Sequence, residues 1–186
     1  KLEANFFEKW IMLPPLEGQY TFQIVAVGKE GLEPLAKFPI YYKVEKPKVF
    51  YQPLYKDPKI FTEMSAAESY LANLINQERK AHDLLPLRYT VDLSKQAYAH
   101  SFDMAENYFL GHVSPVEKMS TKGRLEKAGI KSRKLGECVG RGNFIVEIHA
   151  NLMNSPYHRS VILDPAMNAV GLGIAIAKTP DEDRRY

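Results

Sequence analysis

The chain has 186 residues, of which 45% are hydrophobic and 25% are charged. This is the composition of a globular protein with enough apolar side chains for one good core and a small second unit. The formal net charge of +3 is too small to indicate a nucleic-acid partner. No run of lysine and arginine is interleaved with aromatic residues, as a nucleic-acid groove requires.

Cysteine and hydropathy patterns bear on the cellular compartment. Cys138 is the single cysteine, which excludes an intrachain disulfide. That fits a reducing compartment and also the many exported bacterial proteins that use no disulfides. No stretch approaches the ~20 apolar residues of a membrane-spanning helix. The chain begins at Lys1 rather than Met, so we expect a processed or trimmed piece whose targeting segment is absent.

Residues 1–45 have the character of β structure. Residues 20–27 are rich in aromatic and β-branched side chains, which favour a strand. Residues 28–31 predict a turn, and 35–44 predict a second strand. Within that strand, Pro39 indicates an edge position or a bulge, because proline cannot donate to a β-ladder.

The β segment is incomplete as an independent domain. A third strand is expected at 6–13, but a free-standing sandwich usually needs about seven strands. Either 1–45 is part of a larger, Ig-like domain, which we slightly favour, or it is a small β unit packed on the rest of the chain. Residues 46–62 contain several prolines and predict a semi-rigid linker with aromatic side chains able to lie on the next domain.

From residue 65 the pattern becomes helical. Ser65 and Glu68 have capping-box spacing, and apolar positions then repeat at helical intervals to about His82. Asp92 is placed to cap a second helix over 92–108. Further helices are expected at 121–128, closed by Gly129, and at 143–154, with strands at 134–139 and 170–177. The larger domain therefore spans 63–178, followed by a charged tail at 179–186, and we expect helices packed on a small sheet.

Two histidines stand on bends next to helix ends. Gly111 can end the second helix, and Pro115 biases the residue before it away from helix, so His112 is presented where it can face a cleft. His158 follows the next helical pattern in a similar way, and Glu137 lies between the two. A catalytic zinc site uses three such ligands with a water in the fourth position. Their wide separation follows no local spacing rule, so hydrogen bonding of each histidine to backbone is the better explanation of these residues taken alone.

Other reactive side chains have simpler explanations. His100 lies on the apolar face of its helix and is expected to be a core histidine bonded to a neighbour, and His149 is expected to be solvated or packed. Cys138 is a candidate thiol nucleophile beside Glu137. Because adjacent strand residues point to opposite faces, a Glu137 in the cleft turns Cys138 to the core, and we favour a buried structural thiol.

A family resemblance adds to this interpretation. Residues 99–104, Ala-His-Ser-Phe-Asp-Met, followed by 111–115, Gly-His-Val-Ser-Pro, resemble the signature of bacterial CAP (SCP-like) domains. This superfamily comprises the cysteine-rich secretory, antigen 5 and pathogenesis-related proteins. Further similar stretches follow in the family's order at 74–79, 124–125, 136–137, 153–159, 162–165 and 170–173. The resemblance covers roughly 65–178 and leaves 1–60 outside.

The resemblance implies an α+β fold, the CAP-type α-β-α sandwich, preceded here by a small β-rich unit. His112 and His158 match the two cleft histidines, and Glu137 matches the acidic residue after glycine. Ser155 stands where animal and plant members place a second cleft glutamate. Divalent metals, often zinc, are found in this cleft in some members, which makes His112, His158 and Glu137 the implied metal ligands. Members are typically secreted, so a secreted or cell-envelope location is implied.

Three functions compete. The first is a binding module for a lipid, a cell-envelope component or a protein. The second is a metal-assisted protease or esterase that uses the same cleft. The third is a surface scaffold without chemistry. Because no nucleophile–base pair is evident in the sequence, we favour the binding module and lean against an enzyme.

Overall fold

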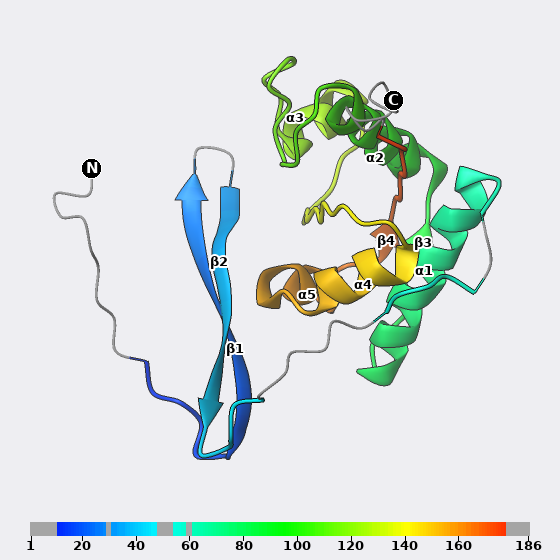
Figure 1. The fold of residues 1–186 in the computed structure, drawn as a ribbon. Helices are drawn as coiled ribbons and strands as arrows, with labels where there is room; N and C mark the ends of the chain where they lie inside the picture. The colour runs from blue at the N-terminus through cyan, green and yellow to red at the C-terminus, as the bar shows by residue number, and fades with distance from the viewer. Residues whose placement is uncertain (1–10, 29–30, 48–53, 59–60, 178–186) are drawn as a thin grey trace, which may run out of the picture.

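The structure is a computed structural model that describes residues 11–28, 31–47, 54–58 and 61–177. Figure 1 shows an α+β protein in which a long β-hairpin precedes a helical unit. The helices are α1 (Met64–Ala81), α2 (Val91–Glu106), α3 (Thr121–Lys127), α4 (Ile145–Met153) and α5 (Pro156–Ile162). The strands are β1 (Gly18–Gly28), β2 (Gly31–Tyr42), β3 (Arg88–Tyr89) and β4 (Ala169–Val170).

The hairpin confirms two of the predicted strands. β1 pairs antiparallel with β2, and Gly28 lies opposite Gly31 across the predicted turn. The register shifts after Ile24, because Leu35 is an extra residue in β2 and forms a β-bulge. The bulge is therefore at Leu35, whereas Pro39 lies within regular pairing.

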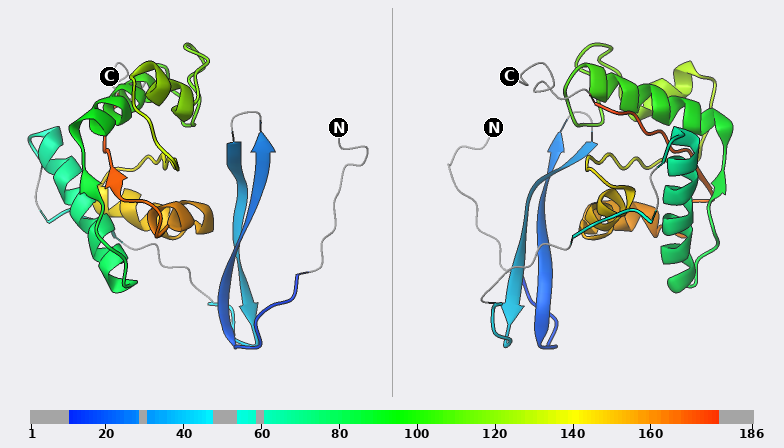
Figure 2. Two further views of the ribbon diagram at one scale, coloured as in Figure 1. Left: turned by 180° about the vertical axis from the view of Figure 1, so that it is seen from behind. Right: turned by 45° about the vertical axis from the view of Figure 1, so that its right-hand side comes forward.

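The predicted third strand, 6–13, is not seen where it can be checked. Its first part, up to residue 10, lies outside the described residues, and 11–13 form no strand. A two-stranded hairpin is marginally stable in isolation, so it needs a surface on which to pack. Figure 2 shows the hairpin beside α5 and away from α1.

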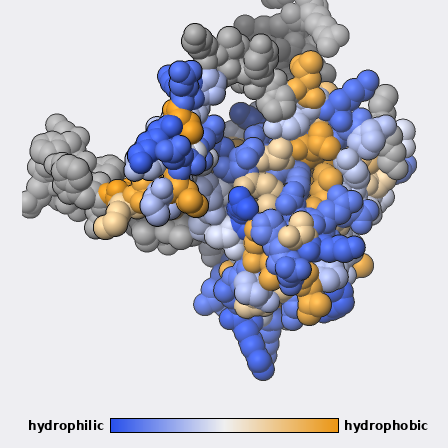
Figure 3. Space-filling model, turned by 90° about the horizontal axis from the view of Figure 1, so that it is seen from below, coloured by the Kyte–Doolittle hydropathy of each residue, from blue (hydrophilic) through white to orange (hydrophobic). Residues whose placement is uncertain are grey.

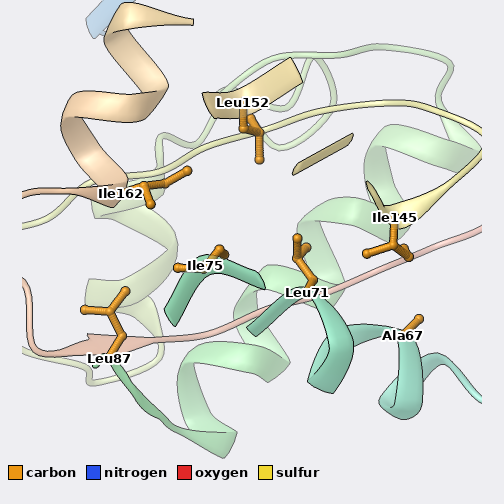
Figure 4. Packing of buried hydrophobic residues seen from close by; sticks show 7 residues of the cluster. All are labelled: Ala67, Leu71, Ile75, Leu87, Ile145, Leu152 and Ile162. Atoms are coloured by element: carbon orange, nitrogen blue, oxygen red, sulfur yellow. The ribbon is translucent and has the colours of Figure 1, made fainter. Parts of the chain in front are cut away.

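The core of the helical unit lies between α1 and α4. Ala67, Leu71 and Ile75 recur every four residues and so share one face of α1. They pack in one cluster with residues from the later elements: Leu87, Ile145, Leu152 and Ile162 (Figure 4). Through this cluster α4 packs against α1, and this packing positions the segments that precede and follow α4.

The C-terminal extended segment packs on α2. β4 pairs parallel with β3 over two residues only, so the strand predicted at 170–177 is much shorter than expected. A side-chain carbon at Gly171 would lie 2.2 Å from the backbone of Leu93, and one at Gly173 would lie 2.0 Å from that of Tyr98. Glycine is therefore required at both positions, because the segment runs against the helix backbone.

Several helix boundaries differ from the predicted ones. α1 begins at Met64 after Glu63 without a side-chain cap, so the predicted capping box at Ser65 is wrong. Glu68 instead turns inward, where its carboxylate accepts from the Tyr89 hydroxyl at 3.3 Å and from the Ile174 backbone at 3.2 Å. The carboxylate joins α1 to β3 and to the extended segment that follows β4 rather than capping its own helix.

The other predicted helices begin and end within about two residues of the expected positions. α2 begins after Thr90, which leaves Asp92 in its first turn near the positive end of the helix dipole. Gly129 closes α3 with a φ of +72°, as predicted. The predicted helix at 143–154 ends at Met153, and α5 follows with Pro156 in its first turn.

The predicted strand at 134–139 is absent, because this segment has no partner strand among the described residues. It nevertheless places Glu137 and Cys138 as expected, on opposite sides of an extended chain. Cys138 packs against the hydrophobic core, and Glu137 contacts the loop after α2.

The linker contacts the helical unit through a carboxylate. Asp57 Oδ2 accepts from the Ile145 backbone N–H at 2.9 Å, and Oδ1 accepts from that of Val146 at 3.0 Å. These are orphan donors at the start of α4, so Asp57 caps a helix that is distant in sequence. Three linker aromatics were predicted to lie on the next domain: Phe50, Tyr51 and Tyr55. Phe50 and Tyr51 lie outside the described residues, and Tyr55 is partly buried.

Candidate functional site

The Glu137 carboxylate lies between the side chains of His112 and Arg124 and bonds to both. Its Oε1 accepts from His112 Nδ1 at 2.8 Å, and its Oε2 accepts from Arg124 Nη2 at 2.5 Å. His100 Nε2 lies 3.9 Å from Oε1. Burial raises the pKa of Glu137, but the His112 hydrogen bond and the Arg124 and His100 charges together hold that pKa below its usual value. The carboxylate is therefore ionised at neutral pH.

The backbone around His112 is fixed by two buried side chains. Arg124 Nη1 donates to the carbonyl of His112 at 2.9 Å and to that of Met119 at 3.2 Å. His100, which is 4% exposed, bonds through Nε2 to the carbonyl of Gly111 at 2.8 Å. The predicted role of His100, a core histidine bonded to a neighbour, is confirmed.

Ser114 closes the bend that follows His112. Its side chain is 1% exposed, and its hydroxyl accepts from the backbone N–H groups of Val116 and Glu117 at 3.1 and 3.0 Å. This is a local serine turn, which does not need a helix or sheet for its hydrogen bonds. These hydrogen bonds hold the Gly111–Pro115 loop, which carries the His112 imidazole.

The contact with Glu137 also determines the tautomer of His112. A carboxylate only accepts, so the proton lies on Nδ1 of the imidazole. The Nε2 lone pair is then free to bind a ligand or to accept a proton. A carboxylate behind a histidine in this way fixes the orientation of the ring.

His158 forms the other end of the site, in the first turn of α5. Ser155 caps this helix, and its hydroxyl accepts from the backbone N–H of His158 at 3.5 Å. Burial lowers the pKa of His158, and the nearby charges of His112 and Lys37 lower it further. The charge effect of His112 reaches His158, and His158 is neutral near pH 7.

Cys138 does not serve as a nucleophile in this arrangement. Burial, with a smaller effect from the Glu137 charge, raises the pKa of its thiol to about 12. Its Sγ lies 3.7 Å from the carbonyl of His158, not near a ring nitrogen that would take its proton. A thiol with so high a pKa has almost no thiolate at neutral pH.

Glu137 is one of the three metal ligands predicted from the sequence, and each of its carboxylate oxygens accepts a hydrogen bond, one from His112 and one from Arg124. In the part of the chain that the structure describes, no three His, Cys, Asp or Glu side chains converge to hold a metal ion.

Residues of the hairpin contribute to the His158 end, and sequence reasoning missed them. Gln23 Nε2 donates to Ser155 Oγ at 2.9 Å, and Gln23 Oε1 accepts from the Tyr157 backbone N–H at 2.9 Å. Lys37 is the direct pairing partner of Gln23 in the hairpin, so the two side chains share the face turned to α5. The alternation of the strands indicates this shared face, but nothing in the sequence indicates what the face contacts.

Comparison with known proteins identifies the fold around this site. The model of the cysteine-rich secretory protein family, CAP, matches residues 72–183. The Bacillus subtilis protein YkwD, which is uncharacterized, is 34% identical over 111 residues, 59% of this chain and 43% of its own. The uncharacterized B. subtilis membrane protein YlbC is 30% identical over 126 residues, 66% of this chain and 33% of its own. The chain thus spans less than half the length of either relative.

Solved structures show the same fold. An extracellular protein containing an SCP domain from Bacillus anthracis is 25% identical, with a TM-score of 0.58 over 67% of this chain and 43% of that one. A cysteine-rich secretory protein from Staphylococcus aureus has a TM-score of 0.51 at 18% identity over 84% of this chain and 53% of its own. An outer surface protein from Borrelia burgdorferi also has a TM-score of 0.51, at 18% identity, over 59% of this chain and 80% of its own.

Proposed function

Since this chain belongs to the CAP family of cysteine-rich secretory proteins, we propose that it is an exported bacterial binding module whose cleft holds a polar group of an envelope component, lipid or protein. The observation that supports this most directly is the Arg124–Glu137–His112 arrangement. It orients one imidazole with a free nitrogen, while the second imidazole is neutral and half-buried. Such a pair accepts hydrogen bonds or contacts a cation without further rearrangement.

The proposed location rests on similar proteins. Structural neighbours are described as extracellular and outer-surface proteins, and the matching family is secretory. Among the described residues, no helix has the length and apolar character needed to cross a membrane. Figure 3 shows hydrophobic and hydrophilic residues interspersed over the face seen from below.

We extend the proposal to a divalent metal such as zinc. His112 Nε2 and a His158 ring nitrogen would supply two ligands, with Glu137 hydrogen-bonded behind His112. Two protein ligands give weaker binding than the three of a catalytic zinc site. Bound zinc would supply a Lewis acid for polarising a carbonyl or phosphoryl oxygen.

Calorimetric titration with zinc at pH 7.5 tests this part. Zinc should bind the wild-type protein but not His158→Ala or His112→Ala, and it should bind the His82→Ala control normally, because that ring is exposed on the end of α1. Affinity should fall as pH decreases, because protonated imidazole does not bind metal. Equal binding by His82→Ala and His158→Ala would place the metal elsewhere.

A metal-assisted or histidine-assisted hydrolase is the second candidate. The specific observation in its favour is the His112–Glu137 contact, which has the form of a general base and its orienting carboxylate. Hydrolysis of a p-nitrophenyl ester or of casein that disappears in His112→Ala would establish it. Absence of turnover at high enzyme concentration, with zinc binding intact, would leave the binding module.

A further inference from the structure

A second hollow lies on the seam between the hairpin and the helical unit. Its volume is about 300 Å³, and it is lined by residues of β1, β2, α4 and α5: Gln23, Leu35, Ala36, Lys37, Asn151, Ser155 and His158. Four of these belong to the hairpin, which lies outside the residues that match the family. The hairpin wall of the hollow therefore lies outside the segment that the family model matches.

Gln23 fixes the hairpin wall of this hollow. Its side-chain amide donates to Ser155 and accepts from the backbone of Tyr157, so both ends of the carboxamide are used and its orientation is set. Ser155 is 5% exposed, which places this contact within the seam. Because Gln23 and Ser155 satisfy each other, they are not the groups that remain for a ligand.

The remaining polar groups favour an anion. They are Lys37, Asn151 and His158, and no acidic residue lines the hollow. Within the described residues, the side chains of Lys37 and Asn151 make no hydrogen bond or ion pair. An ammonium and an amide N–H are donors suited to a carboxylate. A single lysine without an arginine suits a singly charged group better than a dianionic phosphate.

The other side of the hollow is apolar. Leu35 is 65% exposed, since the bulge turns it out of the regular strand register, and Ala36 follows it. Burial of apolar surface contributes about 25 cal/mol per Å². A short hydrocarbon group next to the charged group would therefore add affinity that a bare anion lacks.

We propose that the hairpin and helices α4 and α5 form a binding site for a carboxylate with a short apolar tail. The carboxylate lies against Lys37, Asn151 and His158, and the tail lies on Leu35 and Ala36. This inference rests on the proposed function, because it names the ligand class for the His158 end of the cleft. A free carboxylic acid and the C-terminus of a peptide share this chemistry.

The test is a titration of the ¹⁵N-labelled full chain with hexanoate, followed by backbone amide shifts. Hexanoate should bind weakly and shift amides of Lys37, Asn151 and Tyr157, whereas hexanol and hexylamine should not. Lys37→Gln should weaken binding by roughly threefold to fivefold, the most that one exposed charge supplies. The matched control is Lys95→Gln, which removes one charge from an exposed position on α2.

A second variant tests whether the hairpin forms one side of the binding site. Gln23→Ala releases the hairpin contact and should abolish hexanoate binding while Lys37 stays in place. To separate the two sources, an acetylated tripeptide ending in leucine is compared with its C-terminal amide and with hexanoate. Tighter binding of the free-acid peptide than of hexanoate points to a peptide C-terminus, and the reverse points to a free acid.

Three results would overturn the proposal: no amide shift with hexanoate, equal shifts with hexanol, or equal binding by Lys37→Gln and Lys95→Gln. Zinc titration of Lys37→Gln separates this failure from failure of the proposed function. Zinc binding that persists while hexanoate binding is absent overturns the carboxylate site alone.

Discussion

The surroundings of His112 and those of His158 come from different parts of the chain. His112 is held by His100, Arg124 and Glu137, which all lie inside the segment that matches the family. His158 is approached by Gln23 and Lys37 from a hairpin outside that segment. One imidazole is therefore fixed by the shared fold, while the surroundings of the other are set by what precedes the fold.

Removal of Arg124 should have the largest effect, because it breaks the fixed end. Arg124→Met leaves the partly buried Glu137 carboxylate without its cationic partner and removes hydrogen bonds to the loop carbonyls of His112 and Met119. Loss of one member of a buried pair costs about 3–5 kcal/mol. Urea unfolding followed by circular dichroism measures this change.

The matched control for this variant is Lys122→Met on the same helix. Lys122 is 77% exposed and pairs with Glu126 at 3.7 Å, one helical turn away. Such surface pairs contribute about 0.3–0.5 kcal/mol. If both variants unfolded at the same urea concentration, Arg124 would have no special part in holding the site.

Removal of the Asp57 carboxylate in the linker should have the next largest effect on stability. Asp57→Ala removes the acceptor for two N–H groups at the start of α4 and should destabilise the protein by about 1–2 kcal/mol. Thermal unfolding measures it, with the adjacent and exposed Lys56→Ala as the control. Equal melting temperatures for the two variants would mean that the linker is only a tether.

The site could be predicted from the sequence where the local chemistry is strong. Pro115 predicts a bend beside His112, and Gly129 predicts the end of α3, because these residues restrict or free the backbone themselves. The predicted helix stop at Gly111 is wrong, because α2 ends at Glu106 and Tyr108 rather than Gly111 takes the left-handed conformation, with a φ of +52°. The alternation at Glu137 and Cys138 correctly gave opposite faces, although no strand forms there.

What the sequence did not predict depends on contacts between distant residues. Glu68 fits a capping box locally, but a tertiary contact with Tyr89 takes its carboxylate. Asp57 and Gln23 cap or contact helices about 90 and 130 residues further along the chain. No spacing rule reports such pairs, since only the folded arrangement brings their atoms together.

Release of the hairpin should have a smaller effect on stability than the changes above. Gln23→Ala removes side-chain hydrogen bonds to Ser155 and Tyr157, worth about 1 kcal/mol. Amide hydrogen exchange should then speed up in β1 and β2 and stay unchanged in α1. Gln19→Ala is the control, because Gln19 is exposed and lies on the same face of β1. Faster exchange in both variants would show that Gln23 is not the contact that holds the hairpin.

The smallest effect on stability at neutral pH concerns His149, a buried residue of α4. Its ring is 8% exposed, and its Nε2 lacks a hydrogen-bond partner among the described residues. Burial lowers the pKa of His149, and the nearby Glu78 charge only partly opposes this. The unfolded chain therefore binds the proton more readily than the folded one, and stability is lost as pH falls below about 6.5. His149→Met should match the wild type above that pH and lose less stability below it in urea unfolding series. The exposed His82→Met control should keep the wild-type acid slope, and an unchanged slope in His149→Met would assign the acid sensitivity to the cleft histidines instead.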